Sequence, residues 1–84
     1  MNGRQAKALK AVFAESTRAN VKWAEIETLL VGVGCEIIEG AGSRVRFAFK
    51  TEVETFHRPH PAKEAKRYQV RAARDFLTRI GITP

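Results

Sequence analysis

Residues 42–58 read GSRVRFAFKTEVETFHR, and this stretch decides the fold. Apolar and polar residues alternate along its first half, so that Val45 and Phe47 lie on the same side. Such alternation is typical of a strand with one buried and one wet face. Phe56 must share the buried face with Phe47, and a two-residue loop at residues 51–52 meets that requirement. We therefore predict an antiparallel hairpin in which Phe47 lies opposite Phe56.

The same register predicts a basic open face. It places Arg46 opposite His57, with Arg44 on the same side of its strand. A slip of one residue would turn all these side chains toward the core, which is why the hydrophobic pattern constrains the pairing. We expect Arg44, Arg46 and His57 to emerge together on the side of the sheet that faces solvent.

Helical periodicity flanks the hairpin on both sides. Apolar residues at spacings of three and four predict a helix over 21–34, with Asn20 as its N-cap and Gly34 directly after its end. The same spacing predicts a helix over 67–81, which closes with Gly81. Both helices carry an apolar stripe and are expected to pack on one face of the sheet.

Two further elements complete the predicted order. Ala6, Leu9 and Phe13 form a thin helical stripe that stops near Ser16, which predicts a short additional helix at the N-terminus. Residues 35–39 are rich in β-branched side chains and precede a Gly-Ala-Gly turn, which predicts a first strand. The expected fold is α+β: the order α-β-β-β-α forms a three-stranded antiparallel sheet with both helices on one face, and one additional helix precedes it.

Length and composition exclude several classes of protein. A chain of 84 residues supports one domain, residues 1–84, and 44% apolar residues are ordinary for a globular protein. No window approaches the roughly 18 apolar residues of a membrane helix, and the N-terminus does not resemble a secretory signal, so we expect a cytoplasmic protein without a membrane partner. The single cysteine, Cys35, predicts a small buried residue, and no spacing of Cys and His predicts a metal or another cofactor.

The positive charge is concentrated near the C-terminus. Residues 1–56 carry eight Lys/Arg and seven Asp/Glu, whereas residues 57–84 carry seven and two, so that +5 of the net +6 lies in the last third. Four of these cations, Lys63, Arg67, Arg71 and Arg74, fall at helical spacing on the side away from the apolar stripe. This basic ridge indicates an anionic partner, although a solvated helix face explains the same pattern.

The order of helix, three strands and helix is that of a double-stranded-RNA-binding domain. Within it, the segments WAEIETLLVGVGCEI, GSRVRF, RPHPAKE and VRAARDFLTRIGI, in this order, resemble the HicA family of toxins. The resemblance covers roughly residues 21–83, which divides the chain into an extra helix (1–17) and a core like a double-stranded-RNA-binding domain (20–83). It implies an RNase that cleaves mRNA and that a HicB-type antitoxin holds inactive.

The chain departs from the family at one important position. In the family, the second strand opens with Gly-Ser, and a catalytic histidine follows within two positions. Here Gly42 and Ser43 are present, but Arg44 and Val45 follow them. The His-Pro of a later family segment is kept as His60 and the proline after it.

Metal-free RNA cleavage requires groups that transfer protons and cations that stabilise the charge on phosphorus, roles that suit histidine and arginine. The candidate catalytic residues are therefore His57 or His60, together with Arg44. Each also has a purely structural explanation. His57 can be a solvent-facing strand residue, and His60 can belong to a rigid turn fixed by prolines. Arg44 can be a charge that protects the sheet from edge pairing. The candidate RNA-contacting residues are Ser43, Arg46, Arg58, Lys63, Arg67, Arg71 and Arg74.

Two functions remain open at this point. The first is an endoribonuclease toxin of the HicA type, in which His57 or His60 and an arginine take over cleavage. The second is a non-catalytic domain that binds RNA or an antitoxin and that has lost the catalytic histidine. The basic ridge fits RNA or an acidic antitoxin surface in either case.

Overall fold

The computed structural model of the protein describes residues 1–14 and 21–84. The elements are helix α1 (Gly3–Val12), helix α2 (Trp23–Gly32), strands β1 (Glu36–Glu39), β2 (Arg44–Phe49) and β3 (Glu52–His57), and helix α3 (Arg67–Arg79). The predicted α+β order, with one helix in front of α-β-β-β-α, is confirmed. Within the described residues, no helix combines the length and apolar character that crossing a membrane requires.

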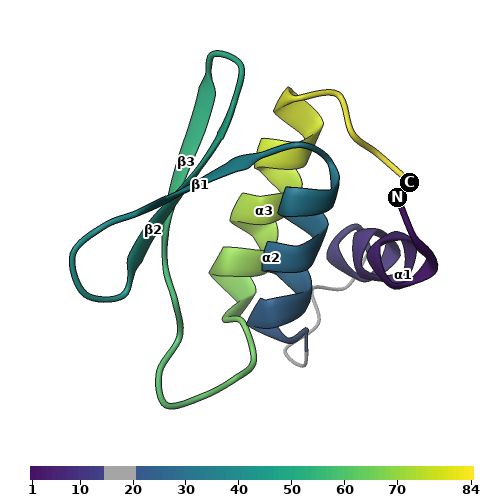
Figure 1. Cartoon of the computed structure of the whole chain (residues 1–84). Helices are drawn as coiled ribbons and strands as arrows, with labels where there is room; N and C mark the ends of the chain where they lie inside the picture. Colours follow the sequence, from purple (N-terminus) through teal and green to yellow (C-terminus); the bar gives the residue numbers. More distant parts are fainter. Residues whose placement is uncertain (15–20) are drawn as a thin grey trace.

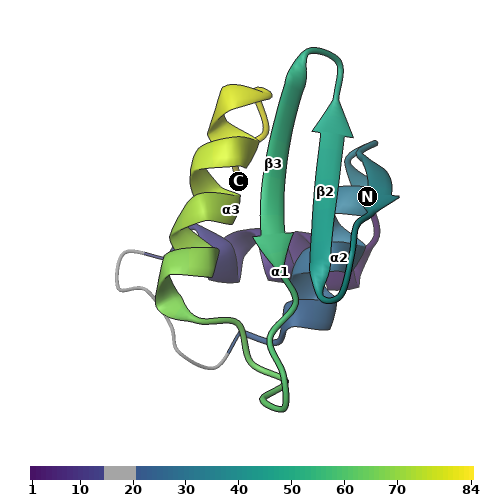
Figure 2. The ribbon, with the colours of Figure 1, turned by 90° about the vertical axis from the view of Figure 1, so that its left-hand side faces the viewer.

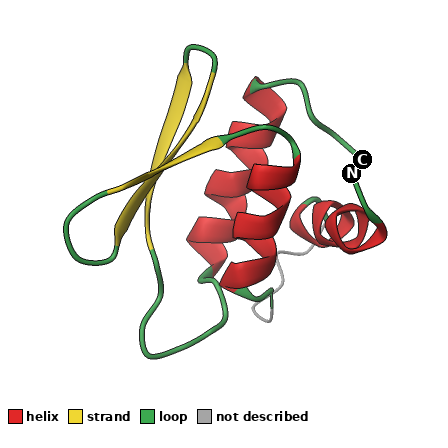
Figure 3. Ribbon diagram, viewed as in Figure 1, coloured by secondary structure: helices red, strands yellow, loops and turns green. Residues whose placement is uncertain are grey.

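The elements form three layers (Figures 1 and 3). The sheet is antiparallel in the order β1-β2-β3, and α2 and α3 lie side by side on one of its faces. Helix α1 packs against α2 and α3 on the side away from the sheet. Figure 2 shows the loop between β3 and α3 reaching past the end of the sheet. None of the helices in the described residues covers the other face of the sheet, as predicted.

Both main helices end where the glycines predict. Gly34 and Gly81 have φ angles of 107° and 83°, values that a side chain would disfavour. Beyond each glycine the chain turns back to bond the last helical carbonyls, and the Cys35 N–H donates to the Leu30 carbonyl at 3.0 Å. The start of α2 differs from the prediction, because Lys22 is its N-cap. The predicted cap, Asn20, lies outside the described residues.

Helix α1 buries a partly different set of residues from the one predicted. Ala8, Leu9 and Val12 are buried, whereas Ala6 is exposed and Phe13 is only half-buried. The helix ends at Val12, so Phe13 is its C-cap. The predicted stripe was therefore right for Leu9 and for Phe13, which packs against the core, and wrong for Ala6, since Ala8 and Val12 are buried in its place.

An aromatic cluster forms the centre of the core between the sheet and α2. The Trp23 ring centroid lies 5.2 Å from that of Phe56 and 6.3 Å from that of Phe47, and the two Phe rings are 5.8 Å apart. The Trp23 indole N–H donates to the Glu27 carboxylate. Cys35 is also buried, and burial raises the pKa of its thiol. Trp23 is thus a core residue, as its place in the apolar stripe predicts.

The hairpin register differs from the prediction by two residues. Phe56 lies opposite Val45, His57 opposite Arg44, and Arg46 opposite Thr55. A shift of two residues keeps every side chain on its predicted face, so the hydrophobic pattern does not distinguish the two registers. The predicted pairings of Phe47 with Phe56 and of Arg46 with His57 are therefore wrong, although each pair shares a face.

The turn between β2 and β3 accounts for this register. It uses Lys50 and Thr51, one residue earlier than predicted, and Lys50 takes a φ of 54°. A positive φ is what tight hairpin turns require, and glycine or asparagine usually supplies it. Since the chain has neither residue here, the sequence carries no clear mark of the turn.

Candidate nucleic-acid interface

Arg44 and His57 lie directly opposite each other at one end of the open sheet face. They are Cα partners in the β2–β3 ladder, and both side chains are exposed. The Arg44 carbonyl accepts a hydrogen bond from the Gly40 N–H at 2.9 Å on the β1 side. In the alternating pattern of an antiparallel ladder, this leaves Arg44 and His57 as a non-hydrogen-bonded pair, in which side chains approach most closely. The structure thus brings an imidazole and a guanidinium together in solvent.

Arg46 extends this basic face along β2. It lies two residues from Arg44 on the same side, between Thr55 of β3 and Ile38 of β1. Within residues 1–14 and 21–84, neither arginine forms an ion pair. Two uncompensated guanidinium groups and one imidazole therefore face the solvent on adjacent positions of the sheet.

Ser43 and His60 lie in the two loops that flank this face. Ser43 is exposed in the β1–β2 turn, and its carbonyl accepts a hydrogen bond from the Arg58 N–H at 2.9 Å. His60 is exposed in the loop between β3 and α3. In the described part of the chain, no strand pairing or hydrogen bond links the His60 side chain to the sheet arginines. Of the two candidate histidines, only His57 is brought to an arginine.

The Arg58 guanidinium forms ion pairs with two carboxylates. Its Nε donates to Glu27 at 2.7 Å, and its two terminal nitrogens donate to Glu39 at 2.7 and 2.9 Å. The hydrogen bond from Arg58 lowers the pKa of the Glu39 carboxyl, and the carboxylates of Glu39 and Glu27 raise the pKa of Arg58. These contacts join α2, β1 and the end of β3, so the Arg58 charge is already neutralised from within the fold.

The predicted basic ridge divides into two parts. Lys63, Arg67 and Arg71 are exposed, with Lys63 in the loop before α3. Arg74 is half-buried, and its guanidinium donates to the carbonyls of Val12 at 2.9 Å and Ala14 at 3.0 Å. Arg74 therefore binds the end of α1. The spacing predicts it as a fourth member of the exposed basic ridge, and that prediction is wrong.

Gln69 is a buried polar residue that the sequence interpretation missed. It is 1% exposed, its Nε2 donates to the His57 carbonyl at 2.6 Å, and its Oε1 accepts from the Lys66 N–H at 2.9 Å. One side chain thereby fixes the end of β3 to the start of α3. The available signal was its place four residues before Ala73, on the edge of the apolar stripe.

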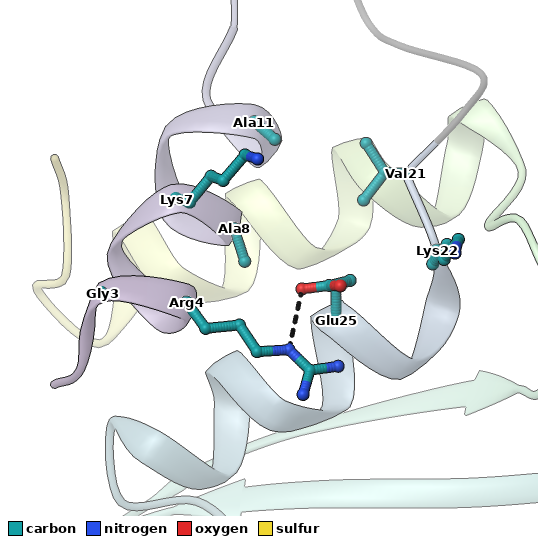
Figure 4. A pocket seen from close by; sticks show the side chains of 8 residues that line it. All are labelled: Gly3, Arg4, Lys7, Ala8, Ala11, Val21, Lys22 and Glu25. Atoms are coloured by element: carbon teal, nitrogen blue, oxygen red, sulfur yellow. Dashed lines mark hydrogen bonds and ion pairs between the residues drawn. The ribbon is translucent and has the colours of Figure 1, made fainter.

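A hollow of about 600 Å³ lies between α1 and the start of α2 (Figure 4). Arg4, Lys7 and Lys22 surround it, and the Arg4 Nε forms an ion pair with Glu25 at 3.5 Å. Because α1 and the sheet lie on opposite sides of α2 and α3, this hollow is separate from the Arg44 and His57 pair (Figure 1). Among the described residues, no group of three or more His, Cys, Asp or Glu is placed to hold a metal ion.

Comparison with known families identifies the chain. Residues 23–82 match the family described as the HicA toxin of bacterial toxin-antitoxin systems. The chain belongs to the HicA toxin family. The matched region begins with α2 and ends just beyond α3, so it contains the whole sheet and both helices that cover it, and it leaves α1 outside. A search of curated proteins and a search of solved structures each found no match.

Membership in the family gives the chain a role as the toxin of a toxin–antitoxin pair. It also makes the change after Ser43 a feature of the site. Arg44 occupies the first position after the Gly-Ser pair, and the structure places His57 directly across the ladder from it. The His57 imidazole therefore lies on the neighbouring strand, opposite the first position after the Gly-Ser pair.

Proposed function

We propose that this toxin cleaves RNA, and that the open sheet face around Arg44, Arg46 and His57 is its active site. The observation that supports this most is the pairing of His57 with Arg44 on an exposed, helix-free surface. Imidazole can take and give a proton near neutral pH, and guanidinium suits the charged oxygens of a phosphate. Together they can supply the proton transfer and the charge stabilisation that phosphoester cleavage without a metal requires.

In this mechanism, His57 removes the proton of a ribose 2′-OH. The 2′ oxygen attacks the adjacent phosphorus, the bond to the 5′ oxygen breaks, and the leaving oxygen takes a proton from solvent. The products are a 2′,3′-cyclic phosphate and a new 5′-hydroxyl end. Arg44 and Arg46 stabilise the negative charge that accumulates on the phosphate oxygens during attack.

Binding also involves the start of α3. Lys63, Arg67 and Arg71 are exposed near the end of β3 that carries His57, because Gln69 fixes these two elements together. Phosphate contacts by such cations are largely independent of base sequence and are sensitive to salt. We propose an mRNA strand as the substrate and a HicB-type antitoxin as the partner that covers this basic surface.

Incubation of the pure protein with a long single-stranded RNA in EDTA tests the proposal. We expect fragments that end in cyclic phosphate, and we expect the double variant His57→Ala/His60→Ala to lose them. Cleavage by the double variant at the rate of the natural chain would exclude a histidine mechanism.

A second function is favoured by the position after Ser43, where Arg44 stands in place of a histidine. In this alternative the chain binds RNA or an antitoxin and does not cleave. It predicts RNA binding without fragments in the same EDTA experiment, for the natural chain and for the double variant His57→Ala/His60→Ala.

A further inference from the structure

Tyr68 is an exposed aromatic residue on the first turn of α3. It is the single tyrosine of the chain and is 56% exposed. The other large exposed apolar residues of the described chain, Met1, Val31 and Val53, are aliphatic. An exposed apolar side chain is common on protein surfaces and needs no explanation by itself. The surroundings of Tyr68 are what make it informative.

Cations surround Tyr68 on the exposed side of α3. Arg67 precedes it directly, Arg71 lies one helical turn after it, and both are exposed. Residues three positions apart are neighbours on a helix surface, so Tyr68 and Arg71 occupy adjacent exposed positions of α3. Exposed Lys63 and Lys66 precede the helix, and its first turn carries no acidic residue, so the positive end of the helix dipole adds to this charge.

None of these groups has a partner within the described fold. Across residues 1–14 and 21–84, no ion pair involves Arg67 or Arg71, and neither a hydrogen bond nor an aromatic contact involves Tyr68. By contrast, Arg74 and Arg79 on the same helix are held by carbonyls of the α1 end and by carboxylates of β3. The first two turns of α3 therefore carry two exposed arginines, Arg67 and Arg71, and an exposed aromatic ring, Tyr68, that have no partner among the described residues.

This turn is also fixed next to the proposed active site. Gln69 follows Tyr68 directly, and its buried amide bonds the His57 carbonyl at 2.6 Å and the Lys66 N–H at 2.9 Å. The exposed ring of Tyr68 and the imidazole of His57 are thus carried by two elements that one buried side chain joins. This bond places the first turn of α3 beside the end of β3 that carries His57.

We propose that Tyr68 is a stacking site for an unpaired RNA base, with Arg67 and Arg71 binding the phosphates on either side of that nucleotide. This inference rests on the proposed function, since it concerns the same RNA. An aromatic ring between cations is how proteins hold single strands, because every base has a face on which to stack and every nucleotide carries a phosphate. A duplex keeps its bases stacked within the helix, so the site selects single-stranded RNA.

Equilibrium binding to a short single-stranded RNA, measured with His57→Ala to prevent cleavage, tests the stacking site. We expect Tyr68→Ala in this background to weaken binding about 10- to 100-fold, and Tyr68→Phe to retain it, because the ring provides the contact. The salt dependence separates the two kinds of contact. Tyr68→Ala should leave the slope of log K against log salt unchanged, whereas Arg71→Ala should reduce its magnitude by about 0.7.

An oligonucleotide with abasic residues is the matched control ligand. It keeps the phosphates and removes the bases, so the proteins with Tyr68 and with Tyr68→Ala should bind it with equal affinity. If the protein binds RNA but Tyr68→Ala binds as tightly as Tyr68→Phe, the stacking site is wrong and the proposed function stands. Equal affinity for duplex and single-stranded RNA would also overturn the stacking site. If no RNA binds at any salt concentration, the proposed function itself fails.

Discussion

Gln69 shows how one buried side chain can position the surface that we propose as the active site. Its carboxamide satisfies the His57 carbonyl and the Lys66 N–H at the junction of β3 and α3. A buried donor or acceptor that loses its partner costs more free energy than the hydrogen bond contributes, since it has also lost water. The proposed site therefore depends on a residue that touches no substrate.

Gln69→Leu should lower the free energy of unfolding by about 1–3 kcal/mol, because it keeps the volume and leaves the His57 carbonyl without its donor. Urea unfolding followed by fluorescence of the single tryptophan, buried Trp23, measures this. Asp75→Asn is the control on the same helix, because Asp75 is exposed and makes no side-chain hydrogen bond or ion pair among the described residues, and a change within about 0.5 kcal/mol is expected. Equal stability of Gln69→Leu and the natural chain would show that the junction does not need the amide.

At the scale of elements, the sequence predicts the helices and strands well and predicts their mutual contacts poorly. Periodicity and glycines are local signals, so α2, α3 and their ends at Gly34 and Gly81 are recovered. Arg58 and Arg74 were placed among the RNA contacts because they are basic, but carboxylates and carbonyls from distant elements bind them. Such partners are more than 15 residues away in the chain, and no spacing rule reports them.

Lys50→Gly tests the hairpin register. Of the described non-glycine residues, only Lys50 has a positive φ, so glycine there should remove strain and stabilise the fold by about 0.5 kcal/mol despite its greater entropy when unfolded. Thr51→Gly, at the neighbouring turn position, should destabilise it by about 0.5–1 kcal/mol. Urea midpoints for the two variants measure the difference. Destabilisation by Lys50→Gly together with stabilisation by Thr51→Gly would instead favour the turn at residues 51–52 that the alternation alone predicts.

Arg74→Met tests the attachment of α1. Loss of the bonds to the carbonyls of Val12 and Ala14 should cost about 1.5–3 kcal/mol, and amide hydrogen exchange in α1 should rise more than exchange in α3. Arg71→Met is the matched control, since Arg71 is exposed one turn away and should leave stability within about 0.5 kcal/mol. RNA affinity should fall in Arg71→Met and should change little in Arg74→Met. An equal loss of RNA affinity in Arg74→Met and Arg71→Met would show that Arg74 also contacts RNA as part of the basic ridge.

At the scale of the whole molecule, the fold separates structural cations from available ones. Arg58, Arg74 and Arg79 connect elements, whereas Arg44, Arg46, Arg67 and Arg71 are exposed and have no ion pair among the described residues. These available arginines lie on the open sheet face and on the first two turns of α3. The open face was predicted correctly because strand alternation fixes it, but the partner of His57 was not, because a slip of two residues leaves that alternation unchanged.

The central claim is that His57, opposite Arg44, performs the proton transfer in RNA cleavage. The most direct measurement is the single-turnover cleavage rate in EDTA for His57→Ala and His60→Ala, with folding of each checked by its urea midpoint. Loss of a positioned general base typically costs about 10²–10⁴ in rate, so His57→Ala should fall by that factor while His60→Ala cleaves within a few-fold of the natural chain. Normal cleavage by His57→Ala together with loss in His60→Ala would contradict the account, and would move the active site from the sheet to the loop before α3.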